Sequence, residues 1–426
     1  MPIKPKPLPV NDPLLDALRS ICSKAVEYPG GLCEALKSTD TATWLRASSR
    51  LHELAAGLNE IVTKDSRFPG DVVLRMSSGS GWSTFYPNSV GQKLIERLLE
   101  QDSPENAIQW LIKILRTSNA DGQMIALVRG VQVKEAINIT SRLRLVPLAD
   151  LPDSPQKRQA TGIHLGWRPT IAPMFDMEPP SAALVISYAA HPFLFNESVT
   201  FLDPSIADSD LVADAILAMT IVGPRLVMQV VSWFSFVDSD LQAAQVGTSF
   251  GSRIVEVIPN QWLDTFPTLD PAMAQRATEA FLLHKGSAKG KLRIALTRIR
   301  LALSRHGVGD KAVEIAIAFE ALLEDGGHSE MTHKIKTRAA RLIGGSEKER
   351  ERTAAIVVRM YDVRSTLVHT GQVNPSKRYS ISNDEPKVSA EVIVAFAIDI
   401  CADLVWKILQ RKDGNIPKWS SFDILG

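Results

Sequence analysis

The sequence contains no segment typical of a membrane-spanning or secreted protein. No apolar run reaches about 18 residues without a charge, the minimum length for a membrane-spanning helix. The first 13 residues, MPIKPKPLPVNDP, have no apolar stretch after their two lysines, so we expect an extended proline-rich arm and no signal peptide. With 426 residues, 45% hydrophobic and 22% charged, the chain is predicted to be a cytoplasmic globular protein of two or three domains.

Cysteine is scarce. Cys22, Cys33 and Cys401 stand at no spacing typical of a metal site or a disulfide framework. We therefore expect reduced thiols, and we predict neither a metal nor a cofactor.

The chain also lacks an overall excess of one charge, because its formal net charge is +1. That balance hides a difference between its parts. Residues 1–284 contain 24 Lys and Arg against 30 Asp and Glu, whereas residues 285–412 contain 23 against 15. The basic part could bind a polyanion such as RNA, or its basic helices could simply be solvated. If it binds RNA, the acidic part could partly cover it until a trigger arrives.

The first two thirds of the chain divide by pattern into a helical and a mixed region. Residues 1–120 form a helical N-terminal region, with helices predicted at 14–27, 42–64, 90–100 and 105–117. Residues 121–271 form a mixed α/β or β-rich module, with strands at 124–133, 136–148, 182–188, 199–202 and 252–259. Within this module, residues 211–234 indicate a helix followed by a buried strand or a second helix. The predicted fold class is therefore multidomain α+β.

The last third is predicted to be an all-α bundle. Residues 272–290 indicate a connecting helix and a Gly/Ser/Lys linker, KGSAKGK; residues 291–412 contain five helices, and 413–426 form a tail. His306 is expected to end the core stripe of the first of these helices. The fifth helix, 389–410, is apolar on most faces, so it must be central to the bundle or lie in a subunit interface.

The fourth helix carries the most informative pattern, TAAIVVRMYDVRSTLVHTG, at residues 353–371. Arg364 interrupts a half-buried apolar row, where a guanidinium needs a carboxylate or a phosphate. His369 lies in the last turn, before a helix-ending Gly371. A permanent cation and a titratable imidazole this close together suit chemistry on a phosphodiester.

Arginine followed by histidine at such a spacing occurs four times, so its context has to select among the pairs. They are Arg46/His52, Arg158/His164, Arg300/His306 and Arg364/His369. Around the last pair stand three blocks in order, DKAVEIAIAFEALLED, HKIKTRAARLIGG and MYDVRSTLVHTG. With these blocks, residues 291–412 resemble the HEPN superfamily, and most closely its Apea-like branch.

This resemblance implies a metal-independent RNA endonuclease, with Arg364 and His369 as the catalytic residues and Ser365 as the polar residue of the motif. Such domains pair their motif helices across a two-fold axis, so a homodimer is expected. They recur as toxins and anti-phage effectors. In this protein the N-terminal region would then sense a phage-derived or cellular trigger. The alternative is a non-catalytic protein that binds nucleotide, RNA or a partner.

Further residues are assigned supporting roles. On a straight helix Arg364 and His369 lie about 140° apart, so either the helix distorts before His369 or two copies build the site. Glu320 faces the bundle and should have a basic partner, Arg364 or Arg338, unless its tip reaches water. Asp362 could orient a partner's histidine or contact Arg359. The cations expected to bind RNA lie on the third helix and are Lys334, Lys336, Arg338 and Arg341.

Overall fold

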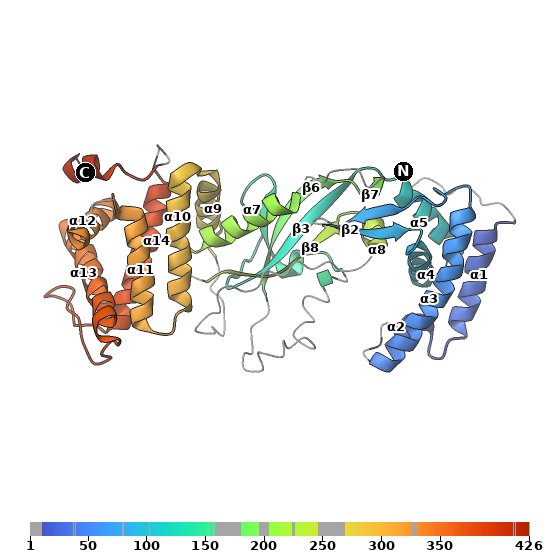
Figure 1. Cartoon of the computed structure of the whole chain (residues 1–426), viewed down its shortest axis with the longest axis horizontal. Coiled ribbons are helices and arrows are strands. Elements are labelled where there is room, and N and C mark those ends of the chain that lie inside the picture. The colour runs from blue at the N-terminus through green and yellow to red at the C-terminus, as the bar shows by residue number, and fades with distance from the viewer. Residues whose placement is uncertain are drawn as a thin grey trace. The chain divides into compact units, whose positions relative to one another are not determined.

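The computed structural model describes most of the chain: residues 11–36, 38, 40–78, 81–101, 103–154, 156–157, 180–195, 204–223, 226–245, 269–325, 330–411, 413 and 415–425. The strands predicted at 199–202 and 252–259, and His164, lie outside these residues. The protein is mixed α+β, as predicted (Figure 1). In the described parts of the chain, no helix is both long enough and apolar enough to cross a membrane.

The chain folds into two compact units, each built from three separate segments. Unit 1 comprises residues 1–125, 186–207 and 233–250, and unit 2 comprises residues 126–185, 208–232 and 251–426. Three strands contribute residues to both units: β3 (Ala120–Arg129), β6 (Ala182–Ala190) and β8 (Met228–Phe236).

Unit 1 contains the predicted helices, packed on one apolar core. Its main helices are α1 (Pro13–Val26), α3 (Thr41–Lys64), α4 (Val90–Gln101) and α5 (Pro104–Arg116), with the short helices α2 (Leu32–Leu36) and α8 (Ser239–Ala244). The side chains of Asp40 and Ser103 accept a backbone N–H at the starts of α3 and α5, which caps those helices. Each end of the four long helices lies within one residue of its predicted position.

The prediction that residues 1–120 are helical was incomplete, because this region also contains a β-hairpin. Its strands are β1 (Leu74–Ser77) and β2 (Trp82–Tyr86), and β7 (Phe193–Phe195) pairs antiparallel with β1 to complete a three-stranded sheet. The hairpin strands are four and five residues long, too short for a clear alternating pattern. The third strand of the sheet lies more than 100 residues further along the chain, so no local sequence pattern predicts the sheet.

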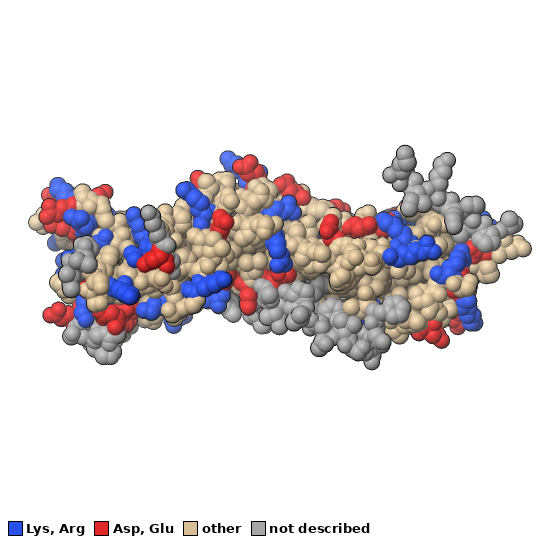
Figure 2. Space-filling model, turned by 90° about the horizontal axis from the view of Figure 1, so that it is seen from above, with Lys and Arg blue, Asp and Glu red and all other residues tan. Residues whose placement is uncertain are grey.

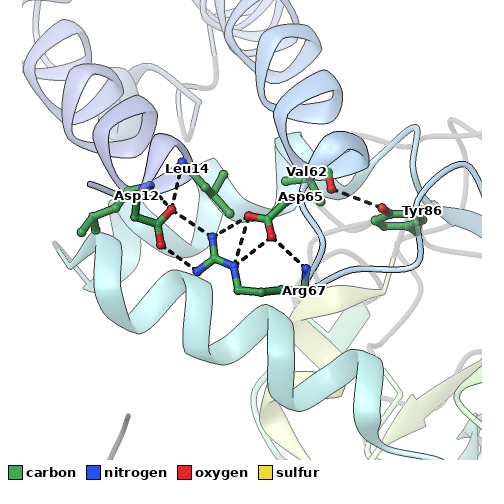
Figure 3. Close-up of polar contacts among 7 residues, drawn as sticks. Asp12, Leu14, Val62, Asp65, Arg67 and Tyr86 are labelled. Carbon is green, nitrogen blue, oxygen red and sulfur yellow. Dashed lines mark hydrogen bonds and ion pairs between the residues drawn. The ribbon is translucent and has the colours of Figure 1, made fainter. Parts of the chain in front are cut away.

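An ion-pair cluster around the buried Asp12 connects the start of α1 to the turn after α3 (Figure 3). Asp12 accepts the backbone N–H of Leu14 and pairs with Arg67 at 2.7 Å. Arg67 also donates to both carboxylate oxygens of Asp65. Because these charges satisfy one another, the cluster is structural and offers nothing to a ligand.

The middle of the chain forms a five-stranded sheet. The strand order is β4-β5-β6-β3-β8, with β4 (Ile137–Asn138) and β5 (Leu143–Pro147) paired antiparallel. A 3-10 turn, Leu148–Asp150, follows β5. Residues 211–234 were predicted as a helix followed by a strand or a second helix; they form the end of α7 (Pro204–Met219) and most of β8, so the strand alternative is correct.

The C-terminal bundle surrounds one apolar helix (Figure 1). It contains α9 (Pro271–Leu283), α10 (Gly286–Ser304), α11 (Val308–Leu323), α12 (Met331–Ile343), α13 (Glu347–Thr370) and α14 (Ala390–Leu409). All of the first five contact α14, which buries more than half of its residues. Of the two predicted positions for this helix, the structure therefore places it at the centre of the bundle.

The Gly/Ser/Lys stretch predicted as a linker is instead the first part of α10. His284 and Lys285 alone separate α9 from α10. Lys289 and Arg293 of α10 both pair with the buried carboxylate of Asp214 in α7, and this pairing fixes α10 in unit 2. His306 lies beyond the end of α10 and is exposed, so it does not end a core stripe as predicted.

The predicted tail also has structure, because it ends in α15 (Trp419–Leu425). Trp419 is 4% exposed, and Phe422 meets its ring edge-on at 5.3 Å between centroids.

We predict that Glu314→Gln destabilises the bundle in a pH-dependent way. Glu314 is buried on α11 and accepts bonds from Arg298 at 2.8 Å and Arg305 at 2.7 Å. Burial raises the pKa of Glu314, but the two arginines outweigh burial and lower it below its ordinary 4.5. The ionised carboxylate therefore stabilises the fold at neutral pH, and that contribution is lost as the pH falls through the lowered pKa.

Thermal unfolding should give a Glu314→Gln variant about 1–3 kcal/mol less stable than the wild type at pH 7, with the gap closing below pH 4.5. Glu324→Gln, at the other end of the same helix, is the matched control and should change stability less. A stability gap for Glu314→Gln that stays constant with pH would contradict this account.

Candidate functional site

Helix α13 carries the arginine–histidine pair and is regular to its last residue. A capping box starts it, in which the Ser346 side chain accepts the Glu349 N–H and the Glu349 carboxylate accepts the Ser346 N–H. The helix ends at Gly371, which has the left-handed φ of 72° and donates its N–H to the Leu367 carbonyl at 2.8 Å. No distortion separates Arg364 from His369, so their side chains leave the axis about 140° apart.

The three residues of the motif differ in their surroundings. Ser365 and His369 are exposed, whereas Arg364 is half-buried. Within the part of the chain that the structure describes, Arg364 makes no hydrogen bond and no ion pair within 4.0 Å. Its guanidinium therefore keeps its donors free for an anion.

Glu320 has a hydroxyl partner and not the basic partner that was predicted. Tyr361, on α13, donates its hydroxyl to Glu320 Oε1, on α11, at 3.2 Å. Neither Arg338 nor Arg364 pairs with Glu320 within 4.0 Å among the described residues. Glu320 is half-buried, so water and the tyrosine hydroxyl together can solvate its carboxylate.

Tyr361 is the residue of this site that sequence reasoning missed. It is 8% exposed, and burial is the main reason why its pKa is raised. The carboxylate of Glu320 raises the pKa of Tyr361 further, while the positive charge of Arg364 acts in the opposite direction. One signal existed in the sequence: a hydroxyl in a buried row of α13 needs an acceptor, and Glu320 was an acid without an assigned donor.

Asp362 pairs within its own chain. Its carboxylate accepts from Arg359 at 3.0 Å, and Arg359 also donates to the Ser380 carbonyl. Of the two roles suggested for Asp362, contact with Arg359 is confirmed.

The start of α11 packs against the end of α13, close to the motif. A Cβ added at Gly309 would lie 2.9 Å from Leu367 Cβ, so glycine is required for this approach. The contact holds the motif-bearing end of α13 against the bundle.

Arg338 was wrongly assigned to an RNA-binding surface. Its side chain is 1% exposed, and it bonds the Leu323 carbonyl at 2.6 Å, Asp325 at 2.6 Å and Asp423 at 2.7 Å. Its guanidinium carbon also lies 5.3 Å from the centre of the Trp419 ring. Arg338 therefore binds α15 to the bundle and is not accessible to a polyanion.

The other cations of α12 are only partly engaged. Lys334 lies 3.8 Å from Asp325, and Arg341 donates to the carbonyls of Phe422 and Asp423. Lys336 has no hydrogen bond or ion pair among the described residues. Figure 2 shows acidic and basic side chains interspersed on the visible face of the bundle, with no continuous basic surface.

Comparison with protein-family models, with curated proteins and with solved structures finds no match.

We predict that Arg338→Ala destabilises the bundle by about 1–3 kcal/mol, because the Leu323 carbonyl and two partly exposed carboxylates lose their charged donor. Hydrogen exchange of α15 should rise together with the loss of thermal stability. Lys336→Ala, on the same helix, should leave both unchanged. An Arg338→Ala variant with wild-type stability and weakened RNA binding would contradict the structural role.

Proposed function

We propose that the C-terminal bundle is a metal-independent RNA endonuclease of the HEPN type, acting as a homodimer. The observation that carries the proposal is the state of Arg364: this half-buried arginine has no hydrogen-bond or ion-pair partner among the described residues. It stands five residues before an exposed histidine at a helix end. A half-buried guanidinium that has no carboxylate partner within the protein favours binding of an anion from outside it. An arginine together with a histidine suits chemistry on a phosphodiester.

The two residues would have different tasks. The guanidinium of Arg364 would hold the scissile phosphate and stabilise the charge that grows on it in the transition state. The imidazole of His369 would accept the proton of the attacking 2′-hydroxyl or donate one to the leaving oxygen. Ser365, exposed beside Arg364, could donate a further hydrogen bond to the same phosphate.

The geometry of α13 supports an assembly from two copies. Because the helix is continuous, Arg364 and His369 of one copy diverge by about 140°. The arginine of one copy would therefore act with the histidine of the other. Val368, next to His369, is 61% exposed, so in this arrangement a second copy could cover it.

The RNA surface proposed here keeps three of the four predicted cations. Lys336 has no partner among the described residues, whereas Lys334 and Arg341 are partly engaged with Asp325 and with the carbonyls of Phe422 and Asp423. Contacts from such cations to phosphates would add affinity without sequence preference. As a biological role we propose a toxin or anti-phage effector in the cytoplasm, with the N-terminal region as the sensor of a trigger.

We predict that Arg364→Ala and His369→Ala each abolish RNA cleavage while leaving the fold intact. Cleavage of a fluorogenic RNA by the purified protein measures this, with circular dichroism as the check on folding. Matched controls are Arg350→Ala, at the far end of α13, and His306→Ala, in one of the other arginine–histidine pairs. Chelator should not change the wild-type rate.

Wild-type cleavage by a folded Arg364→Ala or His369→Ala variant would refute the endonuclease proposal. If the wild type binds RNA but does not cut it, the bundle is a non-catalytic RNA-binding module, which was the alternative function.

A second prediction concerns the oligomeric state. The mass in solution at micromolar concentration should be that of a dimer, and Val368→Glu should shift it toward the monomer and lower cleavage together. The substitution places a charge in the proposed contact, where burial without a partner is costly. A monomer with full activity would contradict the two-copy site.

A further inference from the structure

The hydroxyl of Tyr361 occupies a distinctive place between two opposite charges. It donates to Glu320 across the interface of α13 and α11. Arg364 lies three residues further along α13, on the same side of the helix as Tyr361. Tyr361 therefore neighbours both the acid of α11 and the arginine of the motif, and the charges of both act on its hydroxyl.

An acid next to an arginine would ordinarily pair with it directly. Such pairs form readily, because the guanidinium fork matches a carboxylate and each hydrogen bond between them is assisted by charge. Arg338 shows this behaviour in the same bundle, with two carboxylates on its guanidinium. Arg364 does not, since among the described residues no carboxylate lies within 4.0 Å of it.

We propose that Tyr361 is a positioning residue that holds Glu320 away from Arg364 and so keeps the arginine free for phosphate. The inference rests on the proposed function in one respect, the use of Arg364 to bind RNA phosphate. Tyr361 touches neither the substrate nor the reacting atoms. Its hydroxyl engages Glu320 Oε1, and the buried aromatic ring fixes where that hydroxyl lies.

Removal of this hydroxyl has a specific consequence. In a Tyr361→Phe variant Glu320 loses the hydroxyl that donates to it. Arg364, one helical turn from Tyr361, has no other partner among the described residues, so its guanidinium can replace that donor. A direct Glu320–Arg364 pair then forms and consumes guanidinium donors that RNA would otherwise use. Arg364 remains positively charged, but the carboxylate of Glu320 then offsets its charge and accepts the hydrogen bonds of its guanidinium.

The test measures binding of a fluorescent RNA with 2′-O-methyl groups, which cannot be cleaved through its 2′-oxygen. Tyr361→Phe should weaken binding about five- to tenfold, which corresponds to roughly 1–1.4 kcal/mol. Adding Glu320→Gln to Tyr361→Phe removes the competing carboxylate, so the double variant should recover most of the affinity. This rescue separates positioning from a merely structural role, in which a second substitution would make matters worse.

Tyr379→Phe is the matched control. Tyr379 is also buried in the bundle, at 3% exposed, and its hydroxyl has no hydrogen-bond partner among the described residues. Loss of that hydroxyl should leave RNA affinity unchanged. Equal loss in both variants would overturn the inference, as would wild-type affinity in Tyr361→Phe or a double variant without recovery.

A second measurement needs no RNA, and it separates failure of this inference from failure of the proposed function. The fall in Tm caused by Arg364→Gln is measured in the wild type and in the Tyr361→Phe background. The fall should be larger in that background, because Arg364 then has an internal partner to lose. Equal falls in both backgrounds would overturn the inference even if RNA is cut, and a larger fall would support it even if RNA is not.

Discussion

Each residue of a straight α-helix turns the chain by about 100°, and this fixed rotation governs what the motif of α13 can do. The helix is capped at Ser346, ends at Gly371 and is regular between them. Arg364 and His369 therefore face different directions from one rigid rod. The helix is packed against α11, where Gly309 meets Leu367, and against the apolar α14. In the proposed function, one of the two groups therefore comes from a second copy.

Two arginines of the bundle, Arg338 and Arg364, illustrate how burial and partners decide the role of a side chain. Arg338 is buried and bonded to Asp325, Asp423 and the Leu323 carbonyl, so its charge stabilises the fold. Arg364 is half-buried, and the carboxylate of Glu320 on α11 accepts a hydrogen bond from Tyr361, one turn before Arg364 on α13. Both have the same chemistry and lie on neighbouring helices. Their surroundings alone make Arg338 an anchor for α15 and Arg364 a candidate ligand for phosphate.

Local signals predicted α13 and its neighbours well, because caps and apolar periodicity act over a few residues. Ser346 and Gly371 mark the ends of α13, and the four long helices of unit 1 were found in the same way. Distant partners explain the errors. β1 and β2 meet β7 more than 100 residues later, and Arg338 is buried by Asp423, 85 residues away. The position of Arg364 and His369 on one helix could be predicted. The hydrogen bond from Tyr361 to Glu320 could not, because it depends on how α11 and α13 pack.

The most direct test of the account is complementation between two inactive variants. Copies carrying Arg364→Ala are mixed with copies carrying His369→Ala under conditions that allow subunits to exchange, and RNA cleavage is measured. A mixed dimer keeps one intact arginine from one copy facing one intact histidine from the other, so the account predicts activity well above that of either variant alone. A mixture that stays inactive, although mass measurement shows that mixed dimers have formed, would contradict the two-copy site.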